Sequence, residues 1–505
     1  MLKWIVGSKV DHPLADPKQA KALVADLPQH DYQKALEEIT SWLDSINETE
    51  GFKLERLFEI VELLDATGKP HHRKLLLEYL GMSRQQKFQE NKLWTAGFGF
   101  AKSLDALYLR IVRQYQSGAS GASAVKKQVP AAVTRALRTL ALEVKWTMLR
   151  YGPFDAKLWS SVGELYALAR KAGFADTPIT LQPGPHGTTS VDQEYLKVLM
   201  LWASSTDVLT PVKQEIADRS IAHFSKFFRV ADKPFPGALF VFDAALDRPP
   251  SRIFGTTPDV PGSSFFGPGE ATTKLAEVIA AIQKTGALPS SLILGAPYPA
   301  ETVLSVLRHM ALFWSDTPPA RASERRATTA RITVVPGYLA LLDELERDES
   351  DALNFSVSNA ESWIVQNASE KGYGALVPSP TTDWIRVGEM IGVQVEGSPD
   401  WGVGIIRRVM RDVERQYHVG IEIISRSVIM VQISQGDAGR DGESAVLLSG
   451  SPDANGEIGM VMRAGRYDPN LAIELTGRSK SYTFQPARMM DAGDDFDWAT
   501  YKVAG

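Results

Sequence analysis

The feature that most restricts the fold of this chain is the helical spacing of apolar residues from Asp16 to about Val230. Apolar residues recur every three or four positions, with acidic residues between them, as at Tyr32, Leu36, Ile39, Leu43 and Ile46. This spacing is typical of amphipathic helices, and the alternation expected of strands is almost absent here. We therefore predict an all-helical domain over residues 1–231.

Two local patterns refine this prediction. Gly68-Lys69-Pro70 predicts the end of one helix, so His71 and His72 are expected as a surface pair at the start of the next. The second pattern, Trp159 to Tyr166, resembles the start of a tetratricopeptide helix, with Gly163 allowing a partner helix to approach. Because only one clear copy exists, a helical bundle is favoured over TPR-like repeats. Either fold would form an interaction scaffold.

Residues 232–315 have a mixed character. Ala238–Asp243 has a compact β-type composition, residues 254–269 are rich in Gly, Pro and Ser, and 272–285 and 300–313 have helical spacing. We predict an α/β connecting module with no visible function.

A strand, a polar turn and a second strand follow at Trp363–Val377. Within the turn, Asn367, Ser369 and Gly372 have the spacing N-x-S-x-x-G. Asn and Ser can bond local backbone groups or offer hydrogen bonds outward, and Gly372 permits a positive φ or the close approach of a ligand. Taken alone, the pattern is weak, because such residues usually stabilise a turn.

Arginines precede this turn, at Arg325, Arg326 and Arg331, in a polar segment that leads into the predicted strand Ile332–Val335. An arginine cluster alone is more often a solvated loop. In combination and in this order, however, the arginines and the N-x-S-x-x-G turn resemble the PilZ domains, which bind the bacterial second messenger cyclic di-GMP. The resemblance covers roughly residues 321–430 and includes the later strands Gly402–Val409 and Val419–Ile423.

The resemblance implies an antiparallel PilZ-like β-barrel over residues 316–433 and a ligand site at the arginines and the turn. Arginine presents a planar fork to phosphates and to guanine O6 and N7, and it stacks on bases. The predicted ligand-binding residues are Arg325, Arg326, Arg331, Asn367, Ser369 and Gly372. Ordering of the arginine loop when ligand binds would be the switch.

The arginine spacing departs from the family pattern, which is R-R-x-x-x-R or R-x-x-x-R. Arg321 and Arg325 have the three-residue gap, but Arg325 is not adjacent to the predicted strand. We therefore align Arg326 and Arg331 with the family pair, with one inserted residue. A second departure is Leu339–Leu353, which we predict to be a short inserted helix.

The C-terminal residues 434–505 predict a second small β-domain. After a Gly/Asp/Ser linker, short strands are expected near residues 445–448, 458–462, 471–475 and 481–485. Phe496 and Trp498 are expected to anchor the tail. The predicted class is thus multidomain α+β: a helical bundle, an α/β module and two β-domains.

Composition excludes several functions. The net charge of −5 gives no indication of nucleic acid polymers, and the absence of cysteine removes disulfides and thiolate chemistry. The N-terminal apolar run is too short for a signal peptide, and no stretch is long enough to span a membrane, so a cytoplasmic location is expected. Nucleotide-hydrolase, zinc-protease and serine-hydrolase motifs are missing, so we expect neither an enzyme nor a metal or other cofactor.

Two functions from different classes follow. The first is a cytoplasmic cyclic di-GMP receptor that transmits ligand binding to partner proteins through the helical scaffold. The second is a ligand-free adaptor, in which the barrel docks proteins. An ion pair between Arg331 and Glu370 or Glu422 would favour the adaptor, whereas a free arginine loop together with an open Asn367 and Ser369 face would favour the receptor.

Overall fold

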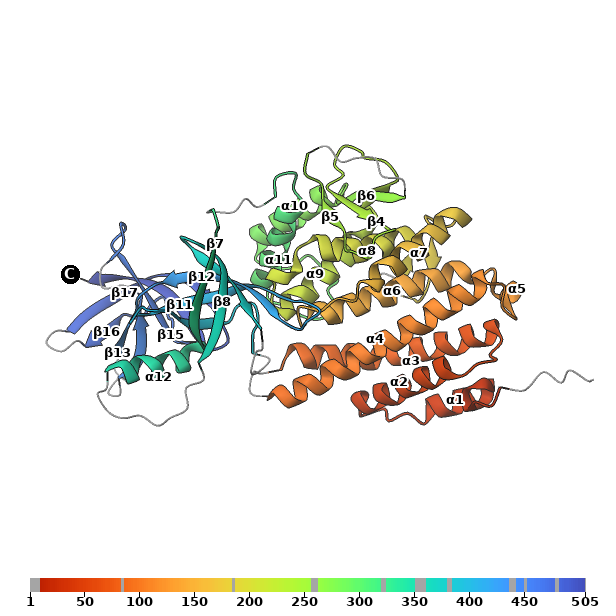
Figure 1. The fold of residues 1–505 in the computed structure, drawn as a ribbon, viewed down its shortest axis with the longest axis horizontal. Helices are drawn as coiled ribbons and strands as arrows, with labels where there is room; N and C mark the ends of the chain where they lie inside the picture. The colour runs from red at the N-terminus through yellow and green to blue at the C-terminus, as the bar shows by residue number, and fades with distance from the viewer. Residues whose placement is uncertain are drawn as a thin grey trace, which may run out of the picture. The chain divides into compact units, whose positions relative to one another are not determined.

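The computed structural model describes residues 10–82, 86–183, 187–255, 262–318, 324–349, 360–378, 384–435, 442–448, 452–476 and 481–504. The chain forms two compact units (Figure 1). The first consists of Met1–Arg150, Phe154–Thr206 and Pro211–Ala320, and the second of Tyr151–Pro153, Asp207–Thr210 and Arg321–Gly505. Each unit has its own core and is described separately.

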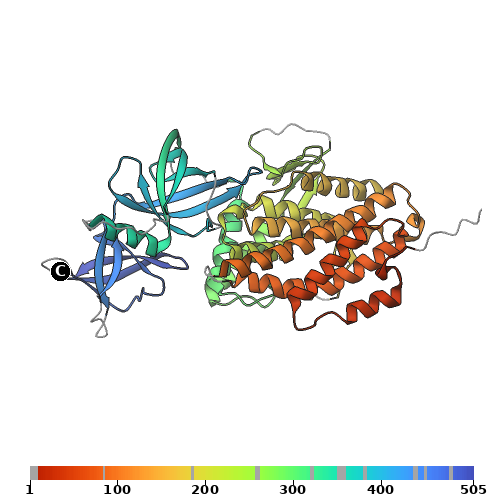
Figure 2. The ribbon, with the colours of Figure 1, turned by 60° about the horizontal axis from the view of Figure 1, so that its bottom comes forward.

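The first unit is built mainly from helices. Their bounds are α1 (Pro17–Ala25), α2 (Tyr32–Glu48), α3 (Leu54–Leu80), α4 (Lys87–Gln116), α5 (Ala122–Val125), α6 (Val129–Met148), α7 (Lys157–Ala172), α8 (Val191–Ala203) and α9 (Pro211–Phe224). Figures 1 and 2 both show α2, α3, α4 and α6 lying side by side. The predicted apolar face of α2 is buried, and Asp31 caps that helix by accepting from Lys34 N. The helical prediction for this region is confirmed.

The predicted helix end at residues 68–70 is wrong, because α3 continues through Pro70 to Leu80. Gly68 does not end the helix. A Cβ at this position would overlap the ring of Phe100 on α4, so the glycine allows α3 and α4 to approach closely. Tertiary packing along α3 outweighs the hydrogen bond lost at Pro70.

The continued helix also changes the place of the two histidines, which the sequence predicts on the surface. Both are buried on α3, at 9% exposure for His71 and 6% for His72. The His72 Nε2 atom accepts a hydrogen bond of 2.6 Å from Trp146 Nε1 on α6. Burial lowers the pKa of His72 to about 3, so the ring is neutral and serves the core.

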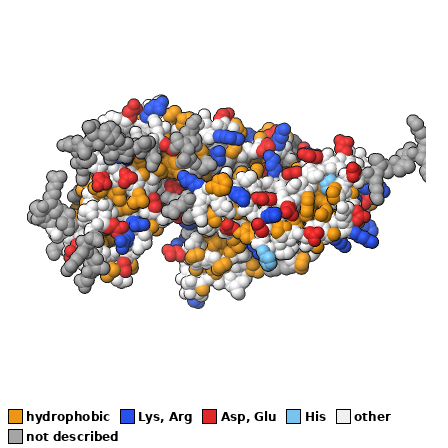
Figure 3. Space-filling view, turned by 90° about the horizontal axis from the view of Figure 1, so that it is seen from below, with side chains coloured by type: hydrophobic (Ala, Val, Ile, Leu, Met, Phe, Trp, Pro, Cys, Tyr) orange, Lys and Arg blue, Asp and Glu red, His pale blue; other side chains and the backbone are white. Residues whose placement is uncertain are grey.

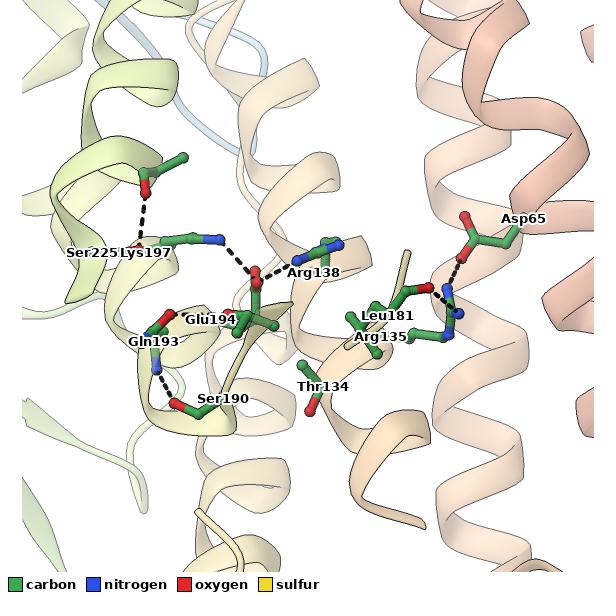
Figure 4. Close-up of polar contacts among 12 residues, drawn as sticks. Asp65, Thr134, Arg135, Arg138, Leu181, Ser190, Gln193, Glu194, Lys197 and Ser225 are labelled. Atoms are coloured by element: carbon green, nitrogen blue, oxygen red, sulfur yellow. Dashed lines mark hydrogen bonds and ion pairs between the residues drawn. The ribbon is translucent and has the colours of Figure 1, made fainter. Parts of the chain in front are cut away.

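The core of this unit contains buried ion pairs (Figure 4). On α8 the carboxylate of Glu194, which is 1% exposed, accepts from Arg138 Nη2 at 2.7 Å and from Lys197 Nζ at 2.8 Å. Between α3 and α6, Arg135 Nη1 donates to Asp65 at 3.0 Å. Burial alone would raise the pKa of Glu194, but Arg138 and Lys197 lower it further than burial raises it.

The predicted α/β connecting module is a small sheet with two helices in the first unit. Its strands, in the spatial order β3-β6-β4-β5, are β3 (Arg229–Ala231), β4 (Phe240–Asp243), β5 (Ser251–Arg252) and β6 (Ser263–Gly267), and its helices are α10 (Ala271–Thr285) and α11 (Ala300–Phe313). A further two-stranded pair is formed by β1 (Ile179–Thr180) and β2 (Thr188–Thr189).

Gly163 on α7 packs against Ala244, which follows β4. The missing Cβ of this glycine therefore makes room for the turn after a strand and not for a partner helix.

The second unit contains two closed six-stranded antiparallel barrels. The first has the order β10-β11-β12-β9-β8-β7, formed by β7 (Arg326–Pro336), β8 (Glu361–Ser369), β9 (Gly372–Val377), β10 (Met390–Val395), β11 (Trp401–Arg411) and β12 (Tyr417–Ser425). The predicted inserted helix is α12 (Gly337–Glu349), between β7 and β8. The barrel prediction is thus confirmed, and the part of the insert beyond residue 349 lies outside the described residues.

The second barrel has the order β13-β14-β15-β18-β17-β16. Its strands are β13 (Ile429–Gln435), β14 (Glu443–Leu447), β15 (Glu457–Arg463), β16 (Ile473–Thr476), β17 (Ser481–Ala492) and β18 (Phe496–Ala504). Residues 429–433, which the sequence analysis assigned to the first barrel, pair with β14 and β16 of the second. Phe496 and Trp498 belong to β18, and Phe496 is buried, so they anchor the C-terminal segment as expected.

Two features tie the second unit together. The helix α12 contributes Tyr338, Leu341 and Leu345 to an apolar cluster that also contains Trp401 of the first barrel and Val461 of the second. The second feature is Tyr151, which is 4% exposed and packs in the core of the first barrel. Its hydroxyl accepts from Val387 N at 3.2 Å, although Tyr151 is far away in the sequence.

No described helix has both the length and the apolar composition that crossing a membrane requires. On the face seen in Figure 3, acidic and basic side chains are interspersed among apolar and neutral ones. This mixed distribution agrees with the small net charge of −5.

Candidate functional site

The predicted N-x-S-x-x-G segment lies at the hairpin between β8 and β9, where a register shift redirects the side chains. Trp363 and Val365 of β8 face the barrel core, as does Ala368 in part. The alternation of inward and outward side chains along β8 therefore shifts by one residue. An irregularity between Val365 and Asn367 in the pairing with β9 produces this shift. Asn367 and Ser369 therefore lie on the outer face of the barrel, where a ligand can reach them.

Asn367 is held against the sheet and meets an arginine. Its Oδ1 accepts a hydrogen bond of 2.9 Å from Arg325 Nη1. The side-chain amide lies over Gly374, where an added Cβ would be 2.5 Å from Oδ1 and 2.7 Å from Nδ2. Gly374 therefore leaves room for the amide to lie flat. The structure thus joins two of the predicted residues, one from the arginine segment and one from the turn.

Ser369 and Gly372 close the hairpin. The Ser369 hydroxyl donates to the Gly372 carbonyl oxygen at 3.3 Å, and the two residues face each other in the β8–β9 pairing. A Cβ at Gly372 would overlap the carbonyl oxygen of Ile421 on β12, and the φ of Gly372 is not positive. The glycine is therefore required by close backbone approach and not by the positive φ that the sequence analysis also allowed.

The other two arginines lie in a strand. Arg326 begins β7 opposite Ala368, and Arg331 lies further along β7 opposite Ile364, where its Nη1 donates to Ser362 Oγ at 3.3 Å. Ile364 is three residues from Asn367, or about 10 Å along a strand. Both arginines belong to β7 and not to the loop in which the order–disorder switch was predicted.

Further arginines approach the turn from a different part of the chain. Arg426, between β12 and β13, donates from Nη1 to the Tyr373 hydroxyl at 2.6 Å and from Nη2 to the Glu370 carbonyl oxygen at 2.9 Å. On β11, Arg407 Nε donates to Glu422 at 2.7 Å, and Glu422 pairs with Gly372 across β12 and β9. No spacing motif in the sequence indicated Arg407 or Arg426.

Two family models match parts of the chain. Residues 344–428 match the middle PilZ domain of the cyclic di-GMP receptor FimW. The first barrel is a PilZ domain. Residues 18–234 match the N-terminal domain of the same receptor, so the chain is similar to FimW in both regions and in their order. A search among curated proteins gave no significant match.

The observed start of β7 changes the arginine alignment. Arg326 and Arg331 were aligned with the family pair because Arg325 was not next to the predicted strand at Ile332. In the structure β7 begins at Arg326, so Arg325 directly precedes the first strand of the PilZ domain. The R-x-x-x-R spacing of Arg321 and Arg325 then fits the family pattern without an insertion, although Arg321 lies outside the described residues.

Proposed function

We propose that this chain is a cyclic di-GMP receptor whose ligand binds on the outer face of the PilZ domain, between the arginine segment that ends at Arg325 and the turn Asn367–Gly372. The observation that carries this proposal is the contact of 2.9 Å between Arg325 and Asn367. It joins the two parts of the family motif, which are separated by about forty residues of sequence.

The chemistry of these residues suits the ligand. Cyclic di-GMP carries two phosphodiesters and two guanines, and a guanidinium can bind either group through two parallel hydrogen bonds. The Asn367 amide offers a donor and an acceptor to a guanine edge. Gly374 leaves room for the Asn367 amide to lie against β9, which fixes the direction of its donor and acceptor.

The structure supports a ranking of the arginines. Arg325 contacts the turn directly, whereas Arg331 is placed further along the strand, at Ser362. Arg321 is included only because of its R-x-x-x-R spacing with Arg325. We therefore assign the main phosphate or guanine contacts to Arg325 and Arg321, and a weaker, longer-range contribution to Arg326 and Arg331.

The alternative function, a ligand-free adaptor, rested on an ion pair from Arg331 to Glu370 or Glu422. Among the described residues, Arg331 forms neither pair, and the Glu422 carboxylate is occupied by Arg407. The contact that favoured the adaptor is therefore not formed. The match to a receptor family favours the ligand-binding function.

The helical unit supplies the second half of the proposal. We propose that it carries the surface for a protein partner and that the chain acts in the cytoplasm. The match of residues 18–234 to the N-terminal domain of a receptor supports a role for this region in the signalling output.

The test is titration calorimetry of the full chain with cyclic di-GMP. Loss of a charge-assisted hydrogen bond costs about 1.5–3 kcal/mol, which corresponds to a tenfold to hundredfold loss of affinity. We expect this loss for Arg325→Ala, and a smaller loss for Arg331→Ala, which serves as the matched control on the same strand edge.

Two results would contradict the proposal at different levels. A folded wild-type chain that binds no cyclic di-GMP would exclude the receptor and leave the adaptor. Binding by the wild type that is unchanged in Arg325→Ala and in Arg321→Ala would keep the receptor but reject the arginine assignment.

A further inference from the structure

The turn of the ligand motif is held by a residue that belongs to the junction between the two barrels. This junction, Ser425–Val428, starts at the last residue of β12 and leads directly into β13 of the C-terminal barrel. Arg426 is its second residue. Its guanidinium makes three hydrogen bonds to the β8–β9 hairpin: to the Tyr373 hydroxyl at 2.6 Å, to the Glu370 carbonyl oxygen at 2.9 Å and to the Ser369 carbonyl oxygen at 3.4 Å.

These contacts restrain both sides of the hairpin. Ser369 is the last residue of β8, Glu370 lies in the turn, and Tyr373 follows Gly372 on β9. The Arg426 guanidinium also lies 5.6 Å from the centre of the Tyr373 ring, within the range of a cation–π contact. A planar group with five donors can satisfy several acceptors at once, which a lysine ammonium cannot do in the same geometry.

The junction itself is fixed to both barrels. Val428 N donates to the Trp401 carbonyl oxygen on β11 at 3.0 Å. The single hydroxyl proton of Ser425 is shared between the carbonyl oxygen of Ser427, at 2.7 Å, and that of Leu448, which follows β14 of the C-terminal barrel. Gly402 allows this close contact, because a Cβ there would lie 2.6 Å from the Ser425 carbonyl oxygen. A shift of the junction must therefore move Arg426 and the hairpin together.

A second arginine makes a parallel connection. Arg407 Nε donates to Glu422 at 2.7 Å, while its Nη1 donates to Asp491 on β17 of the C-terminal barrel at 2.6 Å. Glu422 lies opposite Gly372 in the pairing of β12 with β9. Two guanidinium groups thus connect the residues around the motif with the C-terminal barrel.

We infer that Arg426 is a positioning residue of the cyclic di-GMP site and that, together with Arg407, it couples the ligand-binding turn to the C-terminal barrel. This inference rests on the proposed receptor function and adds the regulation of its site. Arg426 holds Ser369 and Glu370 in place for the ligand, and any movement of the turn on binding is passed to the junction and to β14.

The affinity test compares Arg426→Ala and Arg426→Lys with the wild-type chain by calorimetry with cyclic di-GMP. We expect about a tenfold or greater loss for Arg426→Ala, since two or more hydrogen bonds that fix the turn are removed. Lysine keeps the charge but not the fork, so Arg426→Lys should recover only part of the affinity. The matched control is Arg463→Ala, an exposed arginine on β15 of the C-terminal barrel.

The coupling test measures amide hydrogen exchange of residues 369–373 and 443–448, with cyclic di-GMP at a concentration that saturates each variant. In the wild type, ligand should slow exchange in both segments. In Arg426→Ala combined with Arg407→Ala, it should slow only the first segment. Thermal unfolding of each variant establishes that it is folded before the comparison is made.

The outcomes separate the inference from the function on which it rests. Absence of binding by the wild type would reject the receptor itself. Binding by Arg426→Ala with wild-type affinity would reject the positioning role while leaving the receptor intact. Unchanged exchange at residues 443–448 in the ligand-bound wild type would reject the coupling.

Discussion

At the scale of single residues, the carboxyl of Asp105 on α4 is buried at a cost in free energy. Asp105 is 8% exposed, and its buried Oδ1 atom has no hydrogen-bond partner among the described residues. Burial, reinforced by the negative charge of Glu143, raises the pKa of Asp105 well above its ordinary value. Above the pKa of the unfolded chain, this group therefore lowers the free energy of unfolding.

We predict that Asp105→Asn stabilises the helical unit at pH 7 by about 1–3 kcal/mol. The sign follows from the raised pKa: the penalty is absent below about pH 4, where the unfolded carboxyl is also protonated, and it grows as the pH rises above that value. Urea denaturation at pH 7 and at pH 4 measures the difference. Asp26→Asn, at an exposed aspartate that follows α1, is the control.

Equal midpoints for wild type and Asp105→Asn at pH 7 would show that Asp105 carries no such penalty. A gain of the same size at both pH values would also contradict the prediction, because an effect of packing alone does not depend on titration.

The residues proposed for the ligand site differ in how far the sequence could indicate them. Asn367, Ser369 and Gly372 were proposed from their spacing, since a hairpin turn restricts which residues can occupy each position. Arg325 was also proposed from the sequence, but its priority over Arg331 depends on where β7 starts. Arg426 could not have been proposed from the sequence. It reaches the turn through long-range packing, and nothing in its local sequence distinguishes it from other exposed arginines.

At the scale of elements, α3 and α4 show how one glycine sets the distance between two helices. Gly68 faces the Phe100 ring, whereas Gly99 on α4 has only the Thr40 methyl group near its missing Cβ, at 3.9 Å. Both glycines lie in helix interiors, where alanine is intrinsically preferred by about 1 kcal/mol. Their surroundings therefore predict opposite effects for the same substitution.

We predict that Gly68→Ala destabilises the helical unit by about 1–3 kcal/mol, because the added methyl overlaps Phe100 and overpacks the core. Gly99→Ala should be neutral or stabilise by up to about 1 kcal/mol. Chemical denaturation followed by circular dichroism at 222 nm compares the two. If Gly68→Ala instead raised the free energy of unfolding, this would mean that α3 and α4 can move apart without loss of stability.

Helices and strands could be predicted from the sequence where a single periodicity of apolar residues, helical or alternating, dominated a segment. The apolar face of α2 and the strands β8, β9, β11 and β12 were predicted close to their observed positions. The end predicted at Pro70 failed because a local signal for termination was outweighed by the buried contacts of α3 with α4 and α6. The assignment of β13 to the first barrel failed because a short apolar strand carries no information about its partners.

At the scale of the whole molecule, the core of the PilZ domain is completed by a residue from the N-terminal half of the chain. Tyr151 is buried in that core and has a φ of 58°, a left-handed conformation that is unfavourable for a bulky residue. Hydrogen bonds hold it there: Arg411 N donates to its carbonyl oxygen at 2.7 Å, and Val387 N donates to its hydroxyl at 3.2 Å. The left-handed backbone persists because these contacts determine it.

We predict that Tyr151→Ala destabilises the barrel by about 3–5 kcal/mol, the usual cost of removing a large buried aromatic ring. Urea denaturation, monitored by tryptophan fluorescence, measures the change. Tyr482→Ala on β17, where the ring is 44% exposed, should change stability by no more than about 0.5 kcal/mol. A wild-type midpoint for Tyr151→Ala would show that the barrel does not depend on this ring.

The place of Tyr151 has a practical consequence for anyone who wishes to build a nucleotide biosensor from this protein. The simplest sensor would use one continuous stretch of sequence that contains the PilZ domain. Here the sensing region is discontinuous: residues 321–505 alone lack Tyr151–Pro153 and Asp207–Thr210, which belong to the same compact unit. In a reporter fused to that fragment, the core of the barrel would lack the buried Tyr151 ring. The helical half must therefore be retained, or the missing ring must be replaced by redesign.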